Sequence, residues 1–334
     1  MRPLCKIFVN FAVNEFSFLI LLPVKDKKTY LNFKMDFFNH HLGEFAALLT
    51  ALFWTITSLS FESASNKIGS VAVNILRLFI GFAFLSVFNL VRRGFLLPVD
   101  ASSENWIWLS LSGLVGFVVG DLFLFKSYTM IGSRFSMLIM TLVPPITAFF
   151  SFIIIGERLT LYHYLGMTLT FSGIAVAIFS RPGKGEKLSL KLSPKGILYA
   201  FGGAIGQALG LVLSKFGMKN YDPFAATQIR IIAGIFGYIL LVTVLARWGN
   251  VINATRNKSG MILTSLGAFF GPFLGVSFSL IAVKYTEAGI ASTIMALVPV
   301  FLILPAIILF KQKVTIPEII GSFVSVAGVA LFFL

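Results

Sequence analysis

The chain has 334 residues, of which 57% are hydrophobic and only 12% are charged, and its mean hydropathy is +0.92. Soluble domains carry about 25% charged residues, so the composition excludes a soluble globular protein and indicates an integral membrane protein. The formal net charge of +14 does not indicate nucleic-acid binding, because the basic residues are scattered over polar stretches rather than gathered on one soluble face.

Residues 1–34 carry six of the 27 Lys and Arg residues and precede Met35. We predict that 1–34 is an N-terminal extension without a counterpart later in the chain. Two explanations stay open. Met35 is the natural start and the extension is not native, or the apolar stretch at 7–22 is a signal-like segment.

From residue 43 onward, apolar runs of near 20 residues alternate with short polar stretches, and this length spans a bilayer as a helix. The runs are continuous rather than alternating, which favours helices over barrel strands. We therefore predict an all-α integral membrane protein with ten transmembrane helices. They lie at 43–61, 70–91, 106–125, 135–155, 162–180, 196–214, 224–246, 261–282, 288–310 and 317–333.

The chain is duplicated. Leu-Val-Pro at 142–144 recurs at 297–299, and other identities follow the same offset of 155 residues, while earlier parts of the copies match at an offset of 153. We predict a first five-helix repeat at 35–181, a basic linker at 182–195 and a second five-helix repeat at 196–334. Because five is odd, the second repeat enters from the opposite side, which gives two inverted-topology repeats, a pattern typical of transporters.

Proline interrupts the fourth and ninth helices at equivalent places. Pro144 and Pro299 cannot donate a backbone hydrogen bond, so the carbonyls of Met140 and Met295 lose their helical partners. Such groups persist inside a membrane only where protein or a water-lined cavity satisfies them. Discontinuous helices in matching places point to a binding site, although a packing kink without substrate contact is the alternative.

Each repeat also places an arginine well inside its second helix, Arg77 and Arg230. A buried guanidinium is partnered or extends to the interface. Two roles stay open, namely a helix-locking or interfacial arginine, and recognition of a substrate carboxylate through the planar guanidinium.

Asp121 is the acidic residue placed well inside a predicted helix, and its repeat equivalent is Val276. An intramembrane carboxylate is a functional candidate by default. It could carry a coupling proton or contact substrate, form a structural ion pair, or occupy a hydrated interfacial position.

The third and eighth helices are rich in glycine, which allows close packing of helix backbones. This predicts tight packing, a sliding surface for alternating access, or both.

Glu62 and Lys215 are repeat equivalents of opposite charge at helix ends. They form either a gate pair or terminal solvated charges.

The order of these motifs resembles the EamA-type permeases of the drug/metabolite transporter superfamily. The matching features are Trp54 in the first helix, Arg77, the glycines, Pro144, and Gly-Glu-Arg-Leu-Thr at 156–160. The resemblance implies ten helices, secondary transport of small metabolites and cytoplasmic termini. The charges of the loops between the helices favour an outside N-terminus, but the six basic residues of 1–34 nearly balance the two sides when they are counted as well. The second copy departs from the pattern, with Gln207 at the equivalent of Trp54 and Lys-Gln-Lys at 311–313.

We therefore predict a secondary-active permease of small metabolites such as amino acids or drugs, in the inner cell membrane. It would work by alternating access around a midplane site between the repeats, with protons as a possible coupling ion. A passive channel and a non-transporting membrane sensor are the alternatives. We expect no enzymatic activity, cofactor or metal, since the chain lacks a Walker-type phosphate loop and a His/Cys cluster. The candidate substrate-binding or coupling residues are Trp54, Arg77, Asp121, Met140, Pro144, Gln207, Arg230, Met295 and Pro299.

Overall fold

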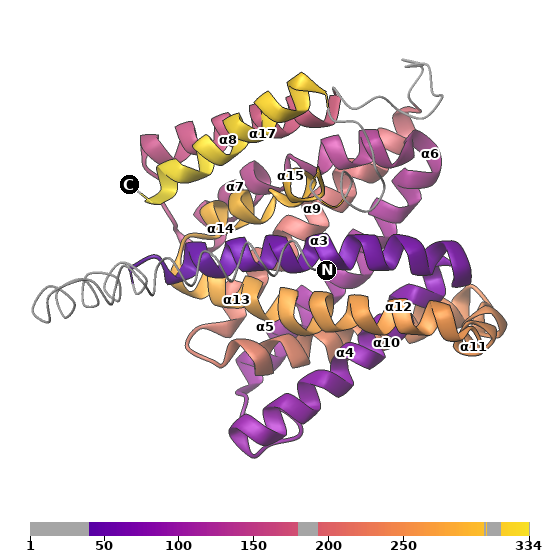
Figure 1. The fold of residues 1–334 in the computed structure, drawn as a ribbon. Helices are drawn as coiled ribbons and strands as arrows, with labels where there is room; N and C mark the ends of the chain where they lie inside the picture. Colours follow the sequence, from indigo (N-terminus) through magenta and orange to yellow (C-terminus); the bar gives the residue numbers. More distant parts are fainter. Residues whose placement is uncertain (1–39, 180–192, 304, 306–314, 334) are drawn as a thin grey trace, which may run out of the picture. The chain divides into compact units, whose positions relative to one another are not determined.

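The computed structural model describes residues 40–179, 193–303, 305 and 315–333 (Figure 1). The predicted N-terminal extension, most of the predicted linker and the motif at 311–313 lie outside these residues. The chain divides into two compact units, Met1–Leu42 and Gly43–Leu334, and the features below lie in the second. The described residues form helices and turns without a strand.

The helices fall into two equivalent sets. The first set is α3 (Leu42–Ile68), α4 (Ser70–Arg93), α5 (Ser103–Gly113), η1 (Leu114–Gly120), α6 (Asp121–Met140), α7 (Val143–Ile155) and α8 (Leu161–Phe179). The second set is α9 (Pro194–Met218), α10 (Pro223–Val244), α11 (Trp248–Thr255), α12 (Lys258–Ala268), η2 (Phe269–Gly275), α13 (Val276–Tyr285), α14 (Ala288–Met295), α15 (Val298–Phe301), α17 (Ile316–Ala330) and η3 (Leu331–Phe333). Within the described residues, seven helical stretches are long and apolar enough to cross a membrane and two more are apolar but shorter. The protein is an all-α membrane protein, as the sequence predicts.

Equivalent helices run in opposite directions, as inverted repeats require. Lys215 near the end of α9 bonds to Thr286, which also lies against Gly43 at the start of α3. The far end of α3 instead contacts α12, through Ile68 and Gly260. Helices α8 and α17, the last of each set, lie side by side and antiparallel (Figure 1), because Gly166 contacts Gly328 while Gly173 contacts Gly321.

Local sequence signals set the helix ends. Asp222 accepts hydrogen bonds from two backbone N–H groups of the first turn of α10, and Pro223 follows it. Ser102 and Thr315 form capping boxes at α5 and α17. Such caps satisfy N–H groups that the helix itself leaves unbonded. At the other end of α7, Gly156 adopts a φ of 82°, a left-handed conformation that glycine accepts without steric strain.

The predicted turn between the third and fourth membrane spans falls inside α6. Ser127 and Ser136 hydroxyls lie 2.7 Å apart, yet nine residues of straight helix would separate them by roughly 13 Å. The chain therefore folds back between these residues. The predicted proline breaks are present in both copies, because the helices are interrupted at Thr141–Leu142 and again at the equivalent Ala296–Leu297.

A seven-residue π-helix occupies the same place in each copy, η1 in the first and η2 in the second. Glycines of η1 meet glycines of α9, since a Cβ on Gly206 would lie 2.7 Å from Cα of Gly120, and one on Gly210 would lie 2.8 Å from Cα of Gly116. The glycines of η2 instead meet larger side chains of α3. The tight packing predicted from the glycines is thus present, and between η1 and α9 it brings backbone against backbone.

Because backbone rather than a flexible side chain faces Gly206, Gly206→Ala should force α9 and η1 apart. Overpacking of this kind costs about 1–3 kcal/mol, so we expect a lower midpoint of thermal unfolding in detergent. Gly249→Ala is the matched control, since nothing lies within 4 Å of its new Cβ. Equal midpoints for both variants would contradict the close contact.

Candidate functional site

A cavity of about 360 Å³ lies between the two sets of helices, and both sets contribute to its wall. This volume suits a small organic molecule. All nine candidate residues predicted from the sequence line it, together with Val276. They are Trp54, Arg77, Asp121, Met140, Pro144, Gln207, Arg230, Met295 and Pro299. Their role in binding or coupling stays a prediction, but the fold brings them to one place.

In the first copy, the arginine has an acidic partner. Arg77 on α4 forms an ion pair with Asp121, the first residue after η1. The other carboxylate oxygen of Asp121 accepts a hydrogen bond of 2.8 Å from the side-chain amide of Gln207 on α9. The ion pair, one of the roles predicted for Asp121, is present and is linked to the second copy through Gln207, while a role in proton coupling or substrate contact stays a prediction.

In the second copy, the equivalent arginine has different surroundings. Arg230 on α10 is 5% exposed, and its guanidinium stacks over the ring of Phe117 at 4.8 Å. A Cβ on Gly113 would lie 2.3 Å from the Arg230 carbonyl oxygen, and one on Gly116 would lie 3.5 Å from its guanidinium. The glycine-rich third span is therefore what makes room for Arg230.

Arg230 has no ion pair with a carboxylate among the residues that the structure describes, and its Nε atom has no hydrogen-bond partner there. The position equivalent to Asp121 is Val276. The copies also differ at Gln207, whose repeat equivalent is Trp54, and this difference lies beside the first one. Gln207 bonds to Asp121, whereas Trp54 lies against Gly275, next to Val276.

Both prolines line the cavity beside the helix breaks, with Met140 and Met295 nearby. The wall also carries hydroxyl groups that sequence reasoning did not single out, from Thr57, Ser58, Ser279 and Ser292. Many buried hydroxyls of this chain bond to the carbonyl four residues earlier, which is how Ser and Thr are satisfied within apolar helices. Their sequence pattern therefore does not separate cavity positions from packed ones.

Beyond one end of the cavity, polar contacts connect the copies in a group that we call the Glu157 cluster, which consists of Glu44, Ser151, Glu157, Lys215 and Thr286. Glu157 pairs with Lys215 and accepts bonds from the Ser151 hydroxyl and from the first N–H of α14. Lys215 donates to the Thr286 carbonyl at 2.6 Å, and the Thr286 hydroxyl donates to Glu44 at 2.8 Å. Lys215 lies four residues beyond Leu211, which lines the cavity.

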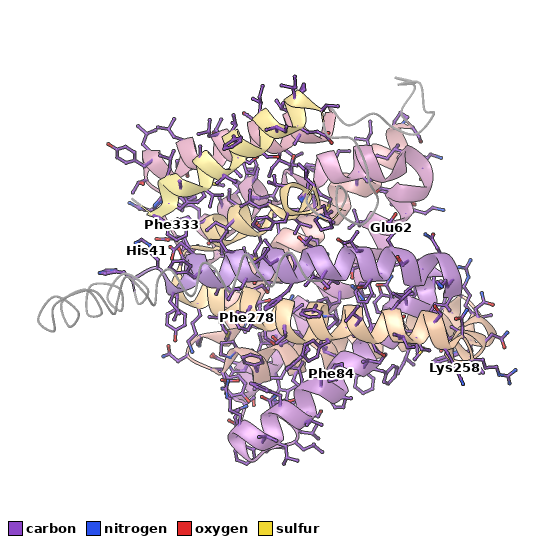
Figure 2. The ribbon with its side chains drawn as sticks, in the orientation of Figure 1. His41, Glu62, Phe84, Lys258, Phe278 and Phe333 are labelled. Carbon is purple, nitrogen blue, oxygen red and sulfur yellow. The ribbon has the colours of Figure 1, made fainter. Side chains whose placement is uncertain are left out.

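This cluster corrects the gate-pair interpretation of Glu62 and Lys215. Glu62 is exposed near the end of α3 that approaches α12, on the side where Figure 2 labels Lys258. Phe333 lies at the other end of α3, against Phe45 (Figure 2). Because the repeats are inverted, equivalent helix ends lie at opposite ends of the bundle, so Glu62 cannot reach Lys215. The Lys215 partner is Glu157.

The model of the EamA-like transporter family matches residues 41–179 and 194–334. The chain belongs to the EamA-like transporter family. Its two matched segments mean that the family's unit occurs twice. Among the described residues, no group of three His, Cys, Asp or Glu side chains is placed to hold a metal ion.

Relatives agree with this assignment. The chain is 23% identical over 283 residues to a protein of Archaeoglobus fulgidus named "Uncharacterized transporter", covering 84% of this chain and 95% of that protein. It is 28% identical over 140 residues to "Uncharacterized transporter YxxF" of Bacillus subtilis, a match that spans 43% of that relative's length. One solved crystal structure has a similar fold, with a TM-score of 0.72 and 17% sequence identity. The match covers 88% of this chain and 96% of the chain in that structure.

The Arg77–Asp121 pair should stabilise the fold. Arg77→Gln leaves the Asp121 carboxylate buried without its counter-charge, and breaking a buried pair in this way costs about 3–5 kcal/mol. We expect a large drop in the midpoint of thermal unfolding. The double variant Arg77→Gln/Asp121→Asn removes both charges and should recover most of the loss. A double variant as unstable as Arg77→Gln would contradict the pairing.

Proposed function

We propose that this protein is a secondary-active transporter of small organic metabolites, such as amino acids or drugs, and that the central cavity is its substrate site. The observation that carries the proposal is the convergence of both proline-broken helices and all three charged side chains of the cavity wall at the interface of the repeats. Membrane transporters bind substrate at such broken helices near the midplane. No catalytic activity is part of this proposal.

We propose further that transport works by alternating access. The Glu157 cluster joins side chains of the first copy, Glu44 and Glu157, to Lys215 and Thr286 of the second. Its ion pair and hydrogen bonds cross from one copy to the other beyond one end of the cavity, and they would have to break if the copies moved apart there. The cluster is therefore the gate of that end, and substrate reaches the cavity from the opposite end in this conformation.

Cysteine accessibility tests this arrangement, because Cys5 is the one cysteine of the sequence. In a Cys5→Ser background, Ser292→Cys places a thiol in the cavity wall at little change in volume. We expect a membrane-impermeant methanethiosulfonate to label it from one face of the membrane only, in right-side-out and inside-out vesicles. Equal labelling from both faces would contradict alternating access and favour a passive channel.

The gate is tested in the same vesicles. Glu157→Gln removes the charge that pairs with Lys215, so labelling of Ser292→Cys from the previously protected face should rise severalfold. Glu62→Gln is the matched control, since this carboxylate is exposed at the far end of α3, and it should leave labelling unchanged. Protection that persists in Glu157→Gln would contradict a gating role for the cluster.

Protons are the coupling ion that the cavity could accommodate, because Asp121 is the one carboxylate in its wall among the described residues. We propose that proton coupling, where present, uses Asp121. Asp121→Asn should then abolish the pH dependence of transport into proteoliposomes, while Glu62→Gln should retain it. Transport with an unchanged pH profile in Asp121→Asn would exclude Asp121 as the proton carrier.

We propose that the protein lies in the inner cell membrane, since its candidate spans are apolar helices, whereas proteins of the bacterial outer membrane are barrels.

A further inference from the structure

We propose that the cavity selects small organic anions, and that Arg230 binds their carboxylate. This inference rests on the proposed function of the cavity and specifies its substrate class. It begins with the charges of the cavity wall, which are two arginines and one aspartate among the described residues. Since Arg77 and Asp121 neutralise each other, the wall carries one uncompensated positive charge.

That charge is buried and directed at the cavity. Arg230 is 5% exposed and lines the cavity, and its guanidinium stacks on the ring face of Phe117. Arginine keeps its charge in proteins and presents several N–H donors in one plane. Its Nε atom has no partner among the described residues. A carboxylate would accept two parallel bonds from such a group and neutralise it.

The comparison between the copies shows that this charge is specific to the second one. Arg77 and Arg230 are repeat equivalents, but Asp121 corresponds to Val276. The first copy provides its own anion, whereas in the second the substrate would provide it. Because Asp121 is already bonded to Arg77 and Gln207, a cation or the ammonium of a zwitterion would have to compete with both for that carboxylate.

The other residues of the cavity wall indicate the chemistry of the part of the ligand beyond its carboxylate. Leu124, Met140, Val276 and Met295 present apolar surface, and five residues of the wall, Ser292 among them, carry hydroxyl groups. Together with a volume of about 360 Å³, this fits a monocarboxylate with an apolar body. Methionine side chains adapt to varied shapes. Which molecules bind is therefore determined by the carboxylate and the overall size more than by the shape of the apolar part.

The test uses the full-length protein in detergent at pH 7.4 and constant ionic strength, with acetate, benzoate and 3-phenylpropionate as probes. Each is compared with the amide and the amine of the same carbon skeleton. We expect at least one carboxylate to raise the midpoint of thermal unfolding more than its amide and amine do. Arg230→Gln should weaken that binding by roughly tenfold or more, and Arg247→Gln, an exposed arginine outside the cavity, should leave it unchanged.

The thermal stability of the arginine variants without ligand gives a second test. Since an uncompensated buried charge is unfavourable, Arg230→Gln should unfold at or above the midpoint of the unsubstituted protein, whereas Arg77→Gln should unfold below it. A fall with Arg230→Gln as large as that with Arg77→Gln would overturn the proposal, because it would show that Arg230 already has a counter-charge.

Other outcomes separate this inference from the proposed function. If amines or amides stabilise the protein more than every carboxylate, and cavity variants abolish that effect, the cavity is a substrate site and only the choice of anions is wrong. If no probe of any class stabilises the protein, and Ser292→Cys labelled with the thiol reagent still transports, the cavity is not the substrate site and both proposals fail.

Discussion

The structure depends on one electrostatic constraint, which is that a guanidinium removed from water needs a counter-charge. Each repeat has one such arginine, and the first repeat has an aspartate that neutralises it, whereas the second has Val276 at the equivalent position. Arg77, Asp121 and Gln207 form a bonded group that connects α4, α6 and α9. Arg230 packs against the glycines at the start of η1, and its guanidinium faces the ring of Phe117 and the cavity. The ion pair in the first copy should stabilise the fold, and we propose that the unpaired arginine of the second copy recognises the substrate.

The scaffold that holds these charges follows from the repeats. Each copy has a π-helix directly before the position of Asp121 or Val276, and π-helical turns recur at functional sites. Glycines let η1 approach α9 at backbone contact, while Trp54 and Thr57 fill the equivalent space between η2 and α3. The two interfaces therefore differ in what faces the glycines, which is backbone in the first and side chains in the second. The Glu157 cluster joins the copies beyond one end of the cavity.

Much of this arrangement could be predicted from the sequence. Apolar run lengths predicted the helices, the odd number of spans predicted the inversion, and the paired prolines predicted where the helices break. Comparing the copies singled out Asp121, Gln207 and Trp54, which all line the cavity. The choice of Arg77 over Arg230 as the Asp121 partner could not be predicted, since it depends on helix rotation and packing. The Glu157 partner of Lys215 also depends on packing, but the predicted inversion by itself excludes Glu62, because it places equivalent helix ends at opposite ends of the bundle.

The central claim is that the absence of an acid beside Arg230 makes the cavity select anions. Val276→Asp restores that acid, and Val276→Asn is its uncharged counterpart of similar size. The most direct measurement is the affinity of both variants for the best-binding monocarboxylate, by thermal unfolding of the full-length protein. The account predicts that Val276→Asp loses carboxylate binding while Val276→Asn keeps most of it. Carboxylate binding that survives in Val276→Asp would contradict the account.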